Sequence, residues 1–486
     1  MKRFIVAFVM AAVSAGITMA SLAQTSLPPP VAQALAAAGI PEGAVSVYVQ
    51  DVDAERPAVS FAADRPLNPA STIKLVTTYA ALDLLGPAYA WNTEVYATGT
   101  MQRDVLNGNL ILKGYGDPKL TLENFWLLLR NVRARGVRDI RGDLILDRSY
   151  FAREDNDPSR FDDQPTRPYN TPPDALLVNY KAVTLQFVPE PDARTVRVLV
   201  EPALPAVQVV SNITASDAPC GDWLSRLKIE PQGNGNNARL AISGTYPRDC
   251  GERSRSFSLL SHPGYVGSLF GALWQELGGS YSGTVREDAV DPASARLLAT
   301  AKSPSLSEVV RDINKFSNNV MARQLYLTLG GVAAGAPATL EKARTTVMNW
   351  LAQKQINAPE LVLENGSGLS RVERISARTM ARLLLDAYRS PVMPELMASL
   401  PLVAVDGTMR KRLGSADVAG RAHIKTGSLT GVRAIAGYVL DASNNRNVVV
   451  FLVNHPNALA AQAAQDVLLK WVYDQNDECC RRRVRR

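Results

Sequence analysis

The sequence predicts an α+β fold in which an antiparallel sheet with packed helices carries a large β-rich insertion. Both ends of the chain combine strand-like stretches with a helix, whereas the middle holds short strand-like runs between turn residues rich in Gly, Asn, Asp and Pro. Of the 486 residues, 46% are hydrophobic and 20% charged, which suits a large core and argues against disorder. We expect one domain from residues 24–89 and 284–486, and inserted material from residues 90–283.

The first 23 residues have the composition of an export signal. Lys2 and Arg3 precede an apolar run from Phe4 to Met19, and small residues follow it up to Ala23. This pattern is typical of a secretory signal peptide cleaved after Ala23. The alternative is a membrane anchor, which needs about 20 apolar residues, and this run is shorter. We therefore expect residues 1–23 to be removed and the mature protein to be exported and soluble.

The N-terminal part of the mature chain mixes helix and strand patterns. Residues 26–30 are expected to be an extended linker, because proline fixes φ and lacks a donor. Asn68 and Pro69 mark a helix start and Gly86 a helix end. The elements expected in order are a helix over residues 31–39, a strand over 44–51 with a hairpin partner over 58–62, and a helix over 69–85.

The insertion and the C-terminal part follow from the same patterns. Ser305 and Glu308 form a capping-box pattern for a helix that ends near Phe316. Two apolar stretches joined by a polar turn, residues 422–440 and 447–454, predict a β-hairpin. The remaining expected elements are insertion strands at residues 109–113, 143–147, 183–188, 196–200 and 239–243, and helices over 320–329 and 458–473.

The cysteines and histidines indicate a disulfide rather than a metal site. Cys220 and Cys250 lie in a turn-rich region of the insertion, and an exported protein favours a bond between them. Cys479 and Cys480 are adjacent in a polar tail, without a surrounding ligand set. The three histidines lack the spacing of a zinc motif. We expect no metal and no cofactor.

Ser71 and Lys74 are the first candidate pair for chemistry. They lie three residues apart at the start of a predicted helix, so both project from one face. A serine hydroxyl needs a base, and lysine can act as one when burial or a neighbouring cation lowers its pKa. The same spacing recurs at Ser225 and Lys228, which we interpret as an incidental solvent-facing pair. The spacing alone is therefore weak evidence.

Ser317 and Asn319 are the second candidate pair. They fall in a polar break between two predicted helices, where a hydroxyl could relay a proton and an amide could hold a substrate carbonyl. The alternative is a simple inter-helix turn, and a similar triplet occurs at residues 443–445 in a predicted hairpin turn.

Lys425, Thr426 and Gly427 form the third candidate motif. They lie on a predicted strand, where glycine marks the close approach of another backbone or a ligand. The strand edge could pair with a peptide while Lys425 faces a carboxylate. The alternative is a surface lysine beside a packing glycine.

The order Ser-x-x-Lys, Ser-x-Asn, Lys-Thr-Gly is the motif set of penicillin-binding proteins and class A β-lactamases. Ser71 and Ser317 are 246 residues apart, which is longer than the separation that a β-lactamase needs between its first two motifs. With further motifs, the chain resembles the D-alanyl-D-alanine carboxypeptidase/endopeptidase family, the class C low-molecular-mass penicillin-binding proteins. Two departures are Tyr115, where Gly is common, and Asn365, where Asp is common. The further motifs are residues 114–118, 169–175, 364–371 and 406–408.

This resemblance implies a penicillin-binding/β-lactamase-like transpeptidase fold and a serine peptidase in the periplasm. Ser71 would attack the bond between two D-alanines of a peptidoglycan stem peptide, and Lys74 would accept its proton. The backbone N–H groups of Ser71 and Ser428 would hold the oxyanion. Ser317 would relay protons and Asn319 would bind the acyl chain.

The resemblance also implies further contacts with the substrate. Lys425 and Thr426 would face the terminal carboxylate, next to Gly427. An acidic residue of the insertion would lie near the diaminopimelate side chain, and Asp147 is the candidate. Cleavage of D-Ala-diaminopimelate cross-links and acylation by β-lactams, as covalent inhibitors, would follow from the same site.

Two other functions remain open. A β-lactamase or esterase of the same fold would deacylate efficiently and would not need a peptide-specific insertion. A non-catalytic cell-wall binding protein would keep the fold as a scaffold, although the intact motifs argue against it.

The net charge of +7 does not describe the folded body. The signal peptide contributes +2 and residues 481–486 contribute +5, so residues 24–480 are neutral. A nucleic-acid-binding face is therefore not expected. The arginine tail could touch anionic envelope components, or it could be a solvated tail without a partner.

Overall fold

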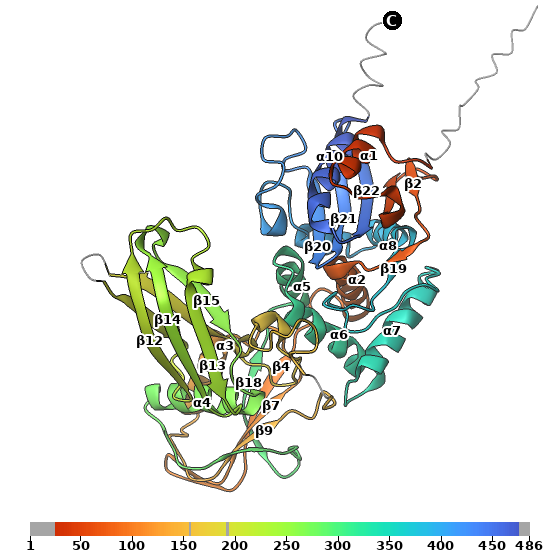
Figure 1. Cartoon of the computed structure of the whole chain (residues 1–486). Coiled ribbons are helices and arrows are strands. Elements are labelled where there is room, and N and C mark those ends of the chain that lie inside the picture. Colours follow the sequence, from red (N-terminus) through yellow and green to blue (C-terminus); the bar gives the residue numbers. More distant parts are fainter. Residues whose placement is uncertain (1–24, 155–156, 191–193, 476–486) are drawn as a thin grey trace, which may run out of the picture.

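The structure, a computed structural model, describes residues 25–154, 157–190 and 194–475 (Figure 1). The expected signal peptide, Cys479, Cys480 and the arginine tail lie outside these residues. Within them, no helix is long and apolar enough to cross a membrane.

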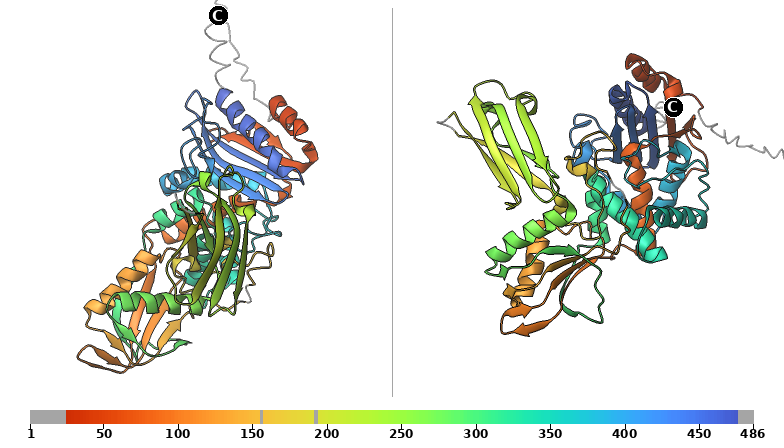
Figure 2. Two further views of the ribbon diagram at one scale, coloured as in Figure 1. Left: turned by 60° about the vertical axis from the view of Figure 1, so that its left-hand side comes forward. Right: turned by 60° about the horizontal axis from the view of Figure 1, so that its bottom comes forward.

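A five-stranded antiparallel sheet of order β2-β1-β22-β21-β20 joins the two ends of the chain, as expected. Helices α1 and α10 cover one face, and α2 and α8 cover the other (Figures 1 and 2). Alternate residues of β21 and β22 point to the two faces, so both strands are buried on both sides. The bounds are β1 Val45–Asp51, β2 Val59–Phe61, β20 Ala422–Leu429, β21 Val432–Leu440, β22 Arg446–Asn454, α1 Pro29–Ala37, α2 Lys74–Leu85, α8 Ala377–Arg389 and α10 Gln462–Asp474.

Two local predictions for this sheet were wrong. Residues 422–440 form two strands rather than one, because Gly431, with φ +77°, turns the chain between β20 and β21. Pro29 and Pro30 belong to the first turn of α1 rather than to a linker, since the first N–H groups of a helix need no intrahelical acceptor.

Further helices pack beneath the sheet and support α2. They include α5, which starts with the predicted capping box of Ser305 and Glu308, and α6, which follows after the break at Ser317. The short strands β3 (Pro66–Leu67) and β19 (Ile375–Ser376) pair beside them. The helix bounds are α5 Leu306–Lys315, α6 Asn319–Ala334, α7 Leu340–Gln353 and α9 Met393–Ser399.

The insertion begins after α2 and contains two parts. One part has the sheets β17-β9-β7-β4-β18 and β16-β8-β6-β5 around two helices, α3 (Leu122–Ala134) and α4 (His262–Glu276), which sequence analysis did not anticipate. The strand bounds are β4 Asn92–Ala97, β5 Thr100–Gln102, β6 Val105–Asn107, β7 Leu110–Gly114, β8 Asp139–Ile140, β9 Leu144–Asp147, β16 Ser280–Tyr281, β17 Val285–Glu287 and β18 Arg296–Lys302.

The other part of the insertion is a lobe that stands apart from the main sheet in Figure 1. Its sheets β11-β10-β15 and β12-β14-β13 share one apolar cluster, and the expected bond between Cys220 and Cys250 is present. The strand bounds are β10 Val183–Pro189, β11 Val196–Glu201, β12 Val207–Ser216, β13 Leu227–Gly233, β14 Ala238–Pro247 and β15 Arg253–Phe257.

The sheet of the insertion extends past the expected end at residue 283. Strand β17 pairs with β9, and β18 pairs with β4. We therefore propose that the insertion ends at residue 302 rather than 283, and that residues 25–89 and 303–475 form the other domain.

Candidate active site

Ser71 lies on a 3-10 turn, Ala70–Ile73, that leads directly into α2. Asn68 anchors this turn, because its Oδ1 accepts from the Ala70 N–H at 2.9 Å and its Nδ2 donates to the Ser370 carbonyl at 2.9 Å. Ala70 has φ +44°, a left-handed conformation that is costly for a residue with a Cβ. The chain thus presents Ser71 from a strained but firmly held turn.

Lys74 is fully buried and contacts the candidate nucleophile. Its Nζ donates to Ser71 Oγ at 3.1 Å, to Asn319 Oδ1 at 2.6 Å and to the backbone carbonyl of Ser367. Desolvation and the nearby Lys425 cation hold the Lys74 pKa well below its usual value. A neutral amine in this place can take the proton from the Ser71 hydroxyl.

Lys425 on β20 forms a second buried lysine–serine pair. Its Nζ donates to Ser317 Oγ at 2.9 Å and to the Thr426 carbonyl at 2.7 Å. Burial lowers the pKa of Lys425 to about 7. Ser317 has φ +57° in the break between α5 and α6, and Asn319 is the first residue of α6. The structure therefore brings the three predicted motifs together.

Glycines allow three backbone segments to meet at Ser71. A Cβ on Gly427 of β20 would lie 2.6 Å from the Pro69 carbonyl oxygen and 3.0 Å from the Ser71 nitrogen. A Cβ on Gly368 would lie 2.1 Å from the Ala70 carbonyl oxygen. Strand β20 is an edge strand of its sheet, and Ser428 directly follows Gly427 on it. Gly427 thus allows the backbone of β20 to lie against the backbone nitrogen of Ser71.

A loop before β20 adds a hydroxyl to this site. Thr408 Oγ1 lies 2.7 Å from Thr426 Oγ1. Asp406 holds the loop in place, because its Oδ2 forms an ion pair with Lys315 at 2.6 Å, two residues before Ser317. The loop therefore ties α5 to β20 across the site.

Asp147 does not belong to this cluster, which corrects the sequence-based expectation. Its side chain is 1% exposed and pairs with Lys113 at 3.1 Å. It also accepts from the Ser149 hydroxyl at 2.6 Å and from the Val290 N–H at 3.0 Å. These contacts hold the sheet of the insertion together and leave no free carboxylate oxygen for a substrate.

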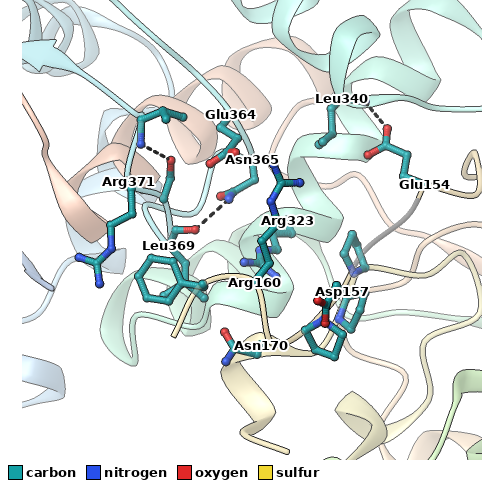
Figure 3. A pocket seen from close by; sticks show the side chains of 16 residues that line it. Glu154, Asp157, Arg160, Asn170, Arg323, Leu340, Glu364, Asn365, Leu369 and Arg371 are labelled. Carbon is teal, nitrogen blue, oxygen red and sulfur yellow. Dashed lines mark hydrogen bonds between the residues drawn. The ribbon is translucent and has the colours of Figure 1, made fainter. Parts of the chain in front are cut away.

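A cavity of about 350 Å³ adjoins the site (Figure 3). Arg371 and Asn365 line it, and both belong to the segment whose Ser367 carbonyl binds Lys74. The insertion contributes Asp157, Arg160 and Phe161 to the lining, and the Arg371 guanidinium lies 4.6 Å from the Phe161 ring centre. The cavity therefore combines both signs of charge, and residues 364–371 connect it to the Lys74 site.

Sequence analysis missed several contributors. The Ser367 carbonyl and Thr408 lie in segments that were noted only as family motifs, without a role. Gly366 and Gly368 were the available indication, because paired glycines beside a polar residue suggest a close backbone approach.

The comparisons with known proteins agree with this geometry. The model of the D-Ala-D-Ala carboxypeptidase 3 (S13) family matches residues 29–474. The chain is 26% identical to D-alanyl-D-alanine carboxypeptidase DacB of Haemophilus influenzae, over 85% of this chain and 86% of that protein. It is 31% identical to the D-alanyl-D-alanine carboxypeptidase of Actinomadura sp. (strain R39), over 82% of this chain and 76% of that protein.

A solved structure supports the same assignment. The crystal structure of penicillin binding protein 4 (dacB) from Haemophilus influenzae superposes with a TM-score of 0.73 and 25% identity, covering 91% of this chain and 99% of that chain. A further structure of that protein holds a β-lactam. The fold is thus the penicillin-binding fold with a large insertion. The chain belongs to the D-Ala-D-Ala carboxypeptidase 3 (S13) family and is a serine-type D-Ala-D-Ala carboxypeptidase.

Proposed function

We propose that the enzyme acts on peptidoglycan stem peptides through an acyl-enzyme on Ser71, with Lys74 as the base. The observation that carries this proposal is the contact of a fully buried lysine amine with the Ser71 hydroxyl at 3.1 Å. The neutral amine removes the hydroxyl proton while Ser71 Oγ attacks the carbonyl of the penultimate D-Ala. The C–N bond then breaks, and the terminal D-Ala leaves once its nitrogen has gained a proton.

The remaining polar groups have separate roles in this scheme. The N–H groups of Ser71 and Ser428 stabilise the oxyanion. Lys74 occupies Asn319 Oδ1, so Asn319 offers its NH₂ group to a substrate carbonyl. Ser317, held by Lys425, delivers its proton to the leaving amine and takes up the proton that Lys74 removed from Ser71, so that Lys74 is neutral again. Water then attacks the ester, with Lys74 again as the base.

The terminal carboxylate of the substrate would bind between β20 and the loop of Thr408. Lys425 supplies positive charge there, while Thr426 and Thr408 supply hydroxyl donors. Gly427 keeps the strand close to Ser71. This arrangement favours peptides that end in a free carboxylate.

We also propose that the cavity receives the side chain of diaminopimelate. That side chain ends in an ammonium and a carboxylate, which suit Asp157 and Arg371 on the cavity wall. Asp157 would thereby take the role expected of Asp147. Cleavage of D-Ala-diaminopimelate cross-links follows, because the leaving group carries an α-carboxylate in both reactions.

Product analysis tests these proposals. The enzyme is incubated with a diaminopimelate stem pentapeptide, with its lysine analogue and with a cross-linked dimer, and free D-alanine and monomers are quantified. We expect release of D-alanine and of monomers, a slower reaction with the lysine analogue, and no product with Ser71→Ala. Equal rates for both peptides would contradict the role of the cavity.

The alternatives predict different products. A β-lactamase of this fold would hydrolyse a chromogenic β-lactam repeatedly and leave stem peptides intact. A binding protein would retain the dimer without cleaving it. We expect instead that one β-lactam, as a substrate mimic, acylates each Ser71 and is released slowly.

Residues 1–23 support a further proposal, export to the periplasm, where this substrate lies. N-terminal sequencing of the mature protein should begin at Gln24, and a start at Met1 would contradict it. The contact of the arginine tail with the envelope stays a prediction.

A further inference from the structure

Glu373 is a buried carboxylate behind Lys74 that the reaction scheme does not use. Its side chain is 0% exposed. Its Oε1 accepts three backbone N–H groups, from Glu364 at 3.2 Å, Asn365 at 3.0 Å and Gly366 at 3.0 Å. Successive N–H groups that converge on one oxygen form an anion-binding nest. Glu373 therefore fixes the backbone of residues 364–366.

This turn carries one of the groups that bind Lys74. Ser367 follows it directly, and the Ser367 carbonyl accepts from Lys74 Nζ. Thr77 of α2 donates to the Gly366 carbonyl at 2.7 Å, so the turn is also tied to the helix of Lys74. A shift of the turn would move an acceptor away from the amine.

Glu373 also contributes negative charge to the surroundings of Lys74. Lys425 on β20 and Arg323 on α6 lower the Lys74 pKa, whereas Glu373 raises it. Burial raises the pKa of Glu373 itself, and the three N–H groups oppose that effect. The other charged or titratable groups that interact with Glu373 are Arg323, Tyr326 and Glu364. Asn365, the other polar side chain of the turn, is neutral.

We propose that Glu373 is a positioning residue for Lys74, which holds the Ser367 carbonyl against the amine and offsets the cations Lys425 and Arg323. The inference rests on the proposed role of Lys74 as the base. It contains two separable effects. The negative charge of Glu373 stabilises the ammonium form of Lys74. The hydrogen bonds from the backbone N–H groups of residues 364–366 to Glu373 keep the Lys74 amine aligned with Ser71.

Three variants separate these effects. Glu373→Gln keeps the shape and an acceptor oxygen but removes the charge. Glu373→Asp keeps the charge but withdraws it by one methylene from the three N–H groups. Glu360→Gln is the matched control, because Glu360 is a partly buried carboxylate that accepts from the Thr379 hydroxyl at 2.6 Å and is not among the charges acting on Lys74.

The readout is the pH dependence of Ser71 acylation by a fluorescent penicillin. A second readout, NMR titration of the Lys74 side chain in protein labelled with ¹³Cε-lysine, needs no turnover. We expect Glu373→Gln to shift the acid limb of the pH profile of acylation, and the titration of Lys74, to lower pH by about one unit. Glu373→Asp should keep the limb in place and slow acylation by about 10- to 100-fold. Glu360→Gln should change neither.

Identical acid limbs and Lys74 titrations in the parent enzyme and a folded Glu373→Gln variant would overturn the proposal. If that variant does not fold, acylation of Glu373→Asp at the parent rate would overturn it. An enzyme that is not acylated at all would contradict the proposed function instead, and the NMR titration would still test Glu373.

Discussion

The active site contains fully buried cations and the insertion contains partly buried ones, and the two regions give them different partners. In the insertion, Lys113 pairs with Asp147 at 3.1 Å and Arg148 pairs with Asp174. In the active site, Lys74 and Lys425 donate only to neutral hydroxyl, amide and carbonyl oxygens among the described residues. A carboxylate stabilises the charged form, whereas burial among neutral groups disfavours it. A cation paired with a carboxylate thus has a structural role here, whereas a lysine buried among neutral groups is suited to proton transfer.

Lys181 of the insertion is an intermediate case. Burial lowers the pKa of Lys181 to about 8, while Asp174 acts in the opposite direction. Burial alone is therefore not a mark of catalysis. What distinguishes Lys74 is its contact with the hydroxyl of Ser71, the proposed nucleophile, on a strained turn.

Replacing Lys74 by arginine should have the largest effect. Arginine keeps the positive charge but cannot act as a base, because its guanidinium stays protonated in this pH range. We expect D-alanine release to fall by about 10³-fold or more. The melting temperature of the variant, measured in parallel, should stay close to that of the parent. Activity retained within tenfold would mean that Lys74 is not the base.

Breaking the Lys113–Asp147 pair should affect stability rather than activity. Lys113→Met leaves the buried Asp147 carboxylate without its cation, and we expect the free energy of unfolding to fall by about 2 kcal/mol. The control is Lys228→Met, which removes an exposed ion pair with Glu230 and should change little. Denaturant unfolding measures both. A selective rise in KM for diaminopimelate peptides would instead restore the substrate role first expected of Asp147.

Substrate binding should weaken as the pH rises through about 7. Burial lowers the pKa of Lys425 to about 7, so the cation is present below this pH and is lost above it. If this cation holds the terminal carboxylate, KM should rise by up to about tenfold per pH unit above 7. Initial rates between pH 6 and 9 measure this change. A KM that stays constant over that range would remove Lys425 from carboxylate binding.

Thr408→Val should have the smallest effect. It removes one hydroxyl from the expected carboxylate site and leaves Thr426 without its partner at 2.7 Å. The loss of one such hydrogen bond is worth about 1 kcal/mol, which corresponds to about a fivefold rise in KM with little change in kcat. Thr408→Ser, which keeps the hydroxyl, should restore the parent KM. A larger fall in kcat than in affinity would indicate a role in the chemical step.

Sequence patterns predicted much of the main sheet and the core of the site. The ends of the chain pair as expected, since Val45–Asp51 lies beside Arg446–Asn454. Short motifs pointed to Ser71, Ser317 and Lys425 because each motif places suitable residue types at a fixed local spacing, and their order matches the motif set of penicillin-binding proteins. The structure shows that these residues meet.

The rest of the site depends on contacts that no local pattern encodes. Ser367 contributes a backbone carbonyl, which any residue could supply. Glu373 accepts from the Gly366 N–H and acts on the site through that turn. Asp147 was misjudged because an acidic residue at a strand end could face either a substrate or a partner such as Lys113. The helices α3 and α4 were missed because strand-like runs surround them.

The central claim, a Ser71 nucleophile activated by Lys74, is tested most directly by mapping the covalent adduct. The folded enzyme is incubated with penicillin, digested and analysed by mass spectrometry. We predict a penicilloyl adduct on the peptide that contains Ser71, no adduct in Ser71→Ala, and a strongly slowed adduct in Lys74→Arg. An adduct on another residue, or undiminished labelling of Ser71→Ala, would contradict the account.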